Sequence, residues 1–92
     1  MSETSIQLPK SVKLNEAPAL KEQLSAVLMT PSPVTLDASA VESIDYSGLQ
    51  LLLAFCRERN MKGLSVDWAA TSEPFEIAAD HLGASAYLGL FR

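Results

Sequence analysis

Residues 34–49 read Val-Thr-Leu-Asp-Ala-Ser-Ala-Val-Glu-Ser-Ile-Asp-Tyr-Ser-Gly-Leu and join two predicted elements. Residues 34–37 form a short run that contains Val34 and Leu36, and they predict a buried strand. Residues 50–59 are strong helix formers, with Leu52 and Cys56 on one apolar stripe, and they predict a long buried helix. A strand, a short irregular loop and a helix start therefore follow one another directly.

The sequence on either side of this stretch predicts five more elements and a tail. Residues 5–8 and 11–14 alternate polar and apolar side chains, which predicts two short strands joined by a tight turn. Asn15 is a candidate N-cap for the helix that follows. The remaining predictions are a helix at 16–28, a strand at 64–68, a helix that begins near Ser72, and a short helix or extended tail at 84–91.

The order of these elements predicts an α/β fold. Two strands are followed by helix, strand, helix, strand and helix, which favours a partly parallel sheet with right-handed crossovers. A chain of 92 residues suits one domain, residues 1–92, whose helices pack mainly on one face of the sheet.

The charge and hydropathy of the chain exclude several partners. Seven basic residues against eleven acidic ones give a net charge of −4 without any basic cluster, so we expect no nucleic-acid partner. The longest apolar run, residues 51–56, is far shorter than the roughly 20 residues that a membrane-spanning helix needs. The polar start lacks the pattern of a secretion signal. We therefore expect a cytoplasmic protein that does not insert directly into a membrane.

Residues suited to catalysis or metal binding are sparse. Cys56 is the single cysteine and His81 the single histidine, so neither a disulfide nor a Cys-rich metal site can form within the chain. Cys56 lies in an apolar helical pattern that favours an inert core thiol. We find no paired nucleophile and base and no phosphate-binding loop. The sequence therefore predicts a protein that is not an enzyme and takes no cofactor and no metal.

The stretch that begins at Val34 resembles the signature of the STAS domain family. In that signature a buried strand ending in Asp leads through a short loop to an Asp-Ser/Thr-Ser/Thr/Ala-Gly-Leu motif and a long apolar helix. Here the strand ends at Asp37, and the motif reads Asp45-Tyr-Ser-Gly-Leu49. The resemblance covers nearly the whole chain, because the other predicted elements fall in the family's order. It implies a STAS-like mixed sheet of four to five strands.

The resemblance also implies a function based on binding. Bacterial STAS proteins such as anti-sigma factor antagonists bind a kinase-like partner, an anti-sigma factor kinase or a chemotaxis kinase-like protein, and are switched off by phosphorylation at the motif. Other members are constitutive cytoplasmic subunits of lipid-transport ABC complexes. The resemblance places the signalling surface on the motif residues Asp45, Tyr46, Ser47, Gly48 and Leu49.

The motif departs from the family at one position. The phosphoacceptor most often follows the Asp directly, and this chain has Tyr46 there. Either the next residue, Ser47, is the phosphoacceptor or this member is not phosphorylated.

Other interpretations of the motif residues stay open at this stage. Ser47 and Gln50 fit a capping box, and Asp45 fits either an alternative N-cap or a contact with the partner. Gly48 permits a close approach or an unusual backbone angle. Tyr46 is either an exposed interface residue or part of the core.

Overall fold

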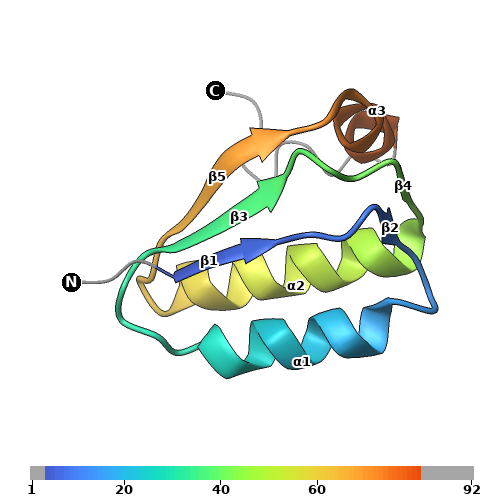
Figure 1. Ribbon diagram of the computed structural model, residues 1–92. Coiled ribbons are helices and arrows are strands. Elements are labelled where there is room, and N and C mark those ends of the chain that lie inside the picture. The colour runs from blue at the N-terminus through green and yellow to red at the C-terminus, as the bar shows by residue number, and fades with distance from the viewer. Residues whose placement is uncertain (1–3, 82–92) are drawn as a thin grey trace.

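The computed structural model describes residues 4–81, in which strands and helices alternate as in an α/β fold (Figure 1). The elements are β1 Thr4–Gln7, β2 Ser11–Val12, α1 Ala17–Val27, β3 Val34–Ala38, β4 Ser43–Ile44, α2 Tyr46–Met61, β5 Val66–Thr71 and α3 Glu73–His81. The predicted α/β class is confirmed, and every element predicted between residues 5 and 81 is present. The predicted tail at 84–91 lies outside the described residues.

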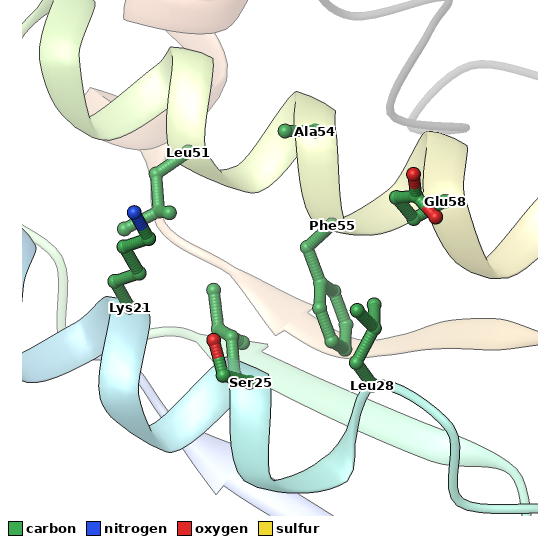
Figure 2. Close-up of a pocket in the computed structure, with 8 residues that line it drawn as sticks. Lys21, Ser25, Leu28, Leu51, Ala54, Phe55 and Glu58 are labelled. Carbon is green, nitrogen blue, oxygen red and sulfur yellow. The ribbon is translucent and has the colours of Figure 1, made fainter.

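The strands form two sheets whose described pairs are all parallel. The first has the order β1-β3-β5, with Ile6 beside Leu36 and Leu36 beside Trp68, and the second pairs β2 with β4. Helices α1 and α2 lie side by side on one face of the larger sheet, and α3 lies beside β4 (Figure 1). Figure 2 shows Phe55 of α2 pointing toward Leu28 at the end of α1. Right-handed crossovers through helices are the usual way to join parallel strands.

The expected tight turn between the two opening strands is wrong. The chain continues in the same direction after β1, since the Leu8 amide donates to the Asp37 carbonyl at 2.8 Å. It then crosses to the second sheet, where the Lys10 carbonyl accepts from the Glu42 amide at 2.7 Å. A two-residue hairpin turn of the favoured types needs positive φ, and Pro9 is locked at negative φ. The two strands therefore pair with β3 and β4 and not with each other.

The core lies between the larger sheet and the two helices. As predicted, α2 is deeply buried, and its Leu52 is fully inaccessible. Phe75 of α3 is also fully buried, with its ring centroid 5.3 Å from that of Trp68. Burial raises the pKa of the Cys56 thiol to about 11, against a smaller lowering effect of Arg59, so the thiol stays protonated at neutral pH. The interpretation of Cys56 as a core residue is therefore confirmed.

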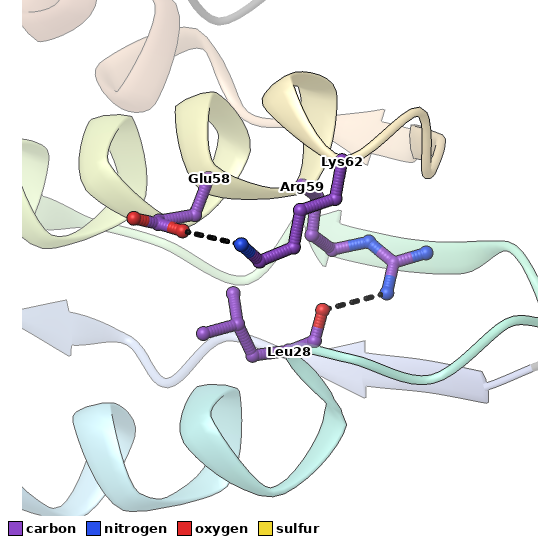
Figure 3. Close-up of polar contacts among 4 residues, drawn as sticks. All are labelled: Leu28, Glu58, Arg59 and Lys62. Atoms are coloured by element: carbon purple, nitrogen blue, oxygen red, sulfur yellow. Dashed lines mark hydrogen bonds and ion pairs between the residues drawn. The ribbon is translucent and has the colours of Figure 1, made fainter.

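Arg59 is buried without a carboxylate partner among the described residues, a role that no local sequence pattern indicates. Its guanidinium instead donates hydrogen bonds of 2.8 to 3.2 Å to backbone carbonyls, one of which is drawn in Figure 3. These carbonyls belong to Val27, Leu28, Thr30, Ser32 and Ser65. The last carbonyls of a helix lack internal partners and carry partial negative charge, which a guanidinium with five donors can satisfy. Arg59 thus connects α2 by hydrogen bonds to the end of α1, to the loop after α1 and to Ser65, which precedes β5.

The helices and the potential metal ligands of residues 4–81 bear on two further kinds of site. Within this range no helix is long and apolar enough to cross a membrane. In the same range no three His, Cys, Asp or Glu side chains are placed to hold a metal ion.

Replacing Arg59 by Met should lower the free energy of unfolding by about 3 kcal/mol, because several buried carbonyls lose their donor together. The matched control is Arg57→Met, which changes an exposed arginine two residues earlier on the same helix and should cost less than about 1 kcal/mol. Urea denaturation followed by circular dichroism measures both. Equal costs for the two variants would contradict the role assigned to Arg59.

Candidate functional site

Asp45 organises the start of α2. Its backbone is extended, and Oδ1 accepts a hydrogen bond from the Gly48 amide at 3.0 Å, which makes Asp45 the N-cap. Its second oxygen, Oδ2, accepts from the amide of Leu14 at 3.2 Å. The Asp45 amide in turn donates to the Val12 carbonyl at 3.3 Å. One residue therefore joins the helix start to β2 and to the loop that precedes α1.

The capping-box interpretation of Ser47 and Gln50 is wrong. Helix α2 begins at Tyr46, so Ser47 lies one residue inside the helix and cannot act as its N-cap. The side-chain amide of Gln50 instead donates to the Tyr46 hydroxyl. Both Asp45 and Ser47 are residue types that cap helices, and the path of the backbone selects Asp45. The Ser47 hydroxyl is therefore not needed to start the helix.

The start of α1 also differs from its prediction, since Glu16 and not Asn15 is the N-cap residue. Its side chain makes no capping bond to the helix. The Glu16 carboxylate accepts from the Lys13 amide and from the Ser11 hydroxyl, each at 3.1 Å. These bonds join the start of α1 to β2 and to the loop between them, and they stabilise the backbone beside Leu14.

Gly48 is required by a close approach of two backbones. A Cβ placed on Gly48 would lie 2.1 Å from the carbonyl oxygen of Val12 and 2.9 Å from its Cγ1 atom. Any residue with a Cβ at position 48 would force α2 away from β2. The close-approach interpretation of Gly48 is therefore confirmed. The alternative, an unusual backbone angle, is wrong, because positive φ among the described residues occurs at Gly63 and not at Gly48.

The five motif residues divide into a buried part and an accessible part. Gly48 and Leu49 are buried and pack beneath the exposed residues of the motif. Asp45 and Ser47 are half-buried. The Tyr46 side chain is 63% exposed, so the ring belongs to the surface and not to the core.

Ser47 lines a shallow groove at the amino ends of the two helices. Next to it Leu14 is 68% exposed, a large apolar side chain held by the bond from its amide to Asp45. The residues that line this first groove are Leu14, Ala17, Pro18, Lys21, Ser47, Gln50 and Leu51. Leu14 was predicted to belong to a strand, and its position beside the motif depends on a contact over 31 residues of sequence.

A second hollow continues between the two helices, and Figure 2 shows the side chains around it. It has a volume of about 140 Å³ and is mainly apolar. Its lining consists of Lys21, Leu24, Ser25, Leu28, Leu51, Ala54, Phe55 and Glu58. Lys21 and Leu51 line both hollows, so the two form one continuous surface, defined here as the α1/α2 groove.

Asp37, near the end of β3, accepts a hydrogen bond from the turn that follows the strand. Its Oδ1 accepts from the Ser39 amide at 2.9 Å. Hydrogen bonds from the side chain and the backbone of Ser39 hold the pKa of Asp37 below its ordinary value, so the carboxylate is charged at neutral pH. These bonds order the loop between β3 and β4, which leads to Asp45.

Comparisons with known proteins agree with this geometry. A family model described as "Mlab, STAS domain" matches residues 2–86. The chain belongs to the STAS domain family. A crystal structure of a sulfate transporter family protein from Wolinella succinogenes aligns with a TM-score of 0.79 and 22% identity, covering 96% of this chain and 72% of that chain. A likeness at 22% identity shows that the two proteins share a fold, and it carries no statement about function. A comparison with curated protein sequences gave no significant match.

Family membership gives the chain a general role as a STAS-type regulatory or binding module. The site is consistent with such a role, because its ordered backbone holds accessible side chains at a helix start.

Replacing Gly48 by Ala should destabilise the STAS domain by about 1 to 3 kcal/mol, although Ala is the better helix former, because the added Cβ overlaps the Val12 carbonyl. The control, Ser47→Ala, changes a neighbouring side chain that lines the groove and should stay within about 0.5 kcal/mol of wild type. Thermal unfolding of both variants is the measurement. A Gly48→Ala variant as stable as wild type would show that the approach of α2 to β2 is not tight.

Proposed function

We propose that this STAS domain, residues 1–92, is a non-catalytic cytoplasmic regulator that binds a kinase-like protein, an anti-sigma factor kinase or a chemotaxis kinase-like protein. The docking surface is the start of α2 together with Leu14. The observation that carries this proposal is the exposure of Tyr46, which follows Asp45 in sequence, and of Leu14, whose amide donates to the Asp45 carboxylate. Large apolar side chains held outward by an ordered backbone are typical anchors of protein interfaces.

Ser47 is the phosphoacceptor in this proposal. It lies at the second residue of α2, where the partial positive charge of the helix start favours a phosphate. Lys21 lines the same groove and no carboxylate lines it, so the groove offers a cation to a phosphate on Ser47. Because Asp45 caps the helix, phosphorylation would leave the cap in place and would change only the docking surface.

Tyr46→Ala should weaken partner binding by about 1 to 4 kcal/mol, because it removes a central aromatic anchor. Its effect on stability should stay within about 0.5 kcal/mol, because the ring is already in solvent. The control is Met61→Ala, which removes another exposed apolar side chain from the far end of α2. A pull-down from host cells with the tagged chain first captures the partner. Calorimetric titration against this captured partner then compares the affinities of both variants with that of wild type. Wild-type affinity for Tyr46→Ala would contradict the proposed surface.

Ser47→Asp and Ser47→Ala test the switch. Both should fold with near wild-type stability, since Asp45 supplies the cap and a negative charge is favourable in the first turn. Ser47→Asp should bind the partner about tenfold more weakly, whereas Ser47→Ala should bind like wild type. In addition, the partner kinase with ATP should add one phosphate to wild type and none to Ser47→Ala, as measured by intact mass. Equal affinities together with no phosphate on wild type would refute the switch.

A second candidate function is a constitutive cytoplasmic subunit of a lipid-transport ABC complex. Tyr46 favours it, because a phenol stands where the phosphoacceptor of switchable members is most often found. In that case the same surface would dock an ATPase subunit, and phosphorylation of Ser47 would play no part. The identity of the captured partner distinguishes the two candidates.

A further inference from the structure

The hollow between α1 and α2 has the size of one large side chain. Its volume of about 140 Å³ is close to that of a roughly 150 Å³ protein cavity that accommodates benzene. Figure 2 shows Phe55 and Leu28 close together on one side of it, with Lys21 and Leu51 toward the first groove. The hollow is open along the surface between the helices. It can therefore accept a phenyl or leucine side chain from another molecule, but it cannot enclose a free small ligand as enzyme and cofactor pockets do.

The charges beside the hollow are asymmetric. Lys21 lies where the two hollows meet, and within residues 4–81 it has no ion-pair partner. Glu58, at the other end, forms an ion pair with Lys62 (Figure 3), with 3.7 Å between Nζ and Oε1. The accessible unpaired charge of the groove is therefore positive. The chain as a whole carries −4, which disfavours an anionic membrane surface as the partner.

We infer that the α1/α2 groove binds an amphipathic segment of the partner protein that places a carboxylate against Lys21 and a phenylalanine- or leucine-sized side chain in the hollow over Phe55. The inference rests on the proposed function, because the first groove contains Ser47 and the second is continuous with it. A helix that lies along a groove and inserts apolar anchors is a common mode of peptide recognition.

This occupant would also explain how a phosphate at Ser47 could release the partner. Ser47 and Lys21 line the same groove, so a phosphate there would attract the Lys21 ammonium and repel the carboxylate of the partner. The release would need no change in the fold.

The first step of the test identifies the occupant in contact with the groove. The photo-crosslinking amino acid p-benzoylphenylalanine replaces Ser25, an exposed residue that lines the hollow, in the full chain in its host cells. Mass spectrometry of the crosslinked product should find a peptide with an acidic residue close to a large apolar one. A peptide without an acidic residue, or a crosslink to a second copy of the chain, would overturn the inference.

The second step measures binding of that peptide, made synthetically with a fluorophore, by anisotropy. Lys21→Glu and Ala54→Trp should each weaken binding about tenfold or more, the first through like charge and the second by filling the hollow. The matched controls are Lys10→Glu and Ala26→Trp, which make the same changes at exposed positions outside the groove and should stay within about twofold. Thermal unfolding verifies that each variant is folded.

A charge swap completes the test. When the acidic residue of the peptide is changed to Lys, it should bind Lys21→Glu more tightly than it binds wild type. Loss of binding without this reversal, or wild-type affinity for Lys21→Glu, would overturn the inference. If only this inference fails, Tyr46→Ala should still bind the whole partner protein more weakly than wild type does. If the proposed function also fails, Tyr46→Ala should bind the partner protein like wild type.

Discussion

The approach of α2 to β2 at Gly48 is the constraint on which the rest of the site depends. The missing Cβ lets the helix start come so close to the Val12 carbonyl that a methyl group would lie 2.1 Å from it. In that position the Asp45 carboxylate reaches both the Gly48 amide and the Leu14 amide. The β2 strand, the loop before α1 and the helix start are thereby ordered together. The exposure of Tyr46 and Leu14 beside Ser47 follows from this arrangement.

This arrangement separates stability from binding. Buried Leu49, Leu52 and Arg59 hold α2 in the fold, whereas Tyr46 and the hydroxyl of Ser47 make no contribution to the core. A carboxylate and not a hydroxyl caps the helix, so chemistry at Ser47 would alter the surface without removing a structural bond. A STAS domain built this way can change its affinity for a partner while its fold stays intact.

Local sequence patterns predicted the fold well wherever the deciding forces are local. Helix α1 is one residue shorter than predicted at each end, and strand β3 is one residue longer than predicted at its carboxyl end. The predictions come this close because amphipathic periodicity and the flanking prolines determine the bounds of both elements. The predicted tight turn after β1 was wrong, because the alternation of polar and apolar side chains indicates a strand but not which other strand it pairs with. The cap of α2 was ambiguous because Asp45 and Ser47 both satisfy the local rule. Arg59 could not be recognised at all, because most of its acceptors lie 27 to 32 residues away in sequence.

The central claim, that the partner docks at the amino ends of α1 and α2, can be tested most directly by amide hydrogen exchange. Exchange would be measured for the full chain alone and saturated with the captured partner. Docking there should slow exchange most at residue 14 and in the first turns of α1 and α2, where weakly protected amides lie beneath the docking surface. Unchanged exchange in these segments, with slowing confined to β5 and α3, would contradict it.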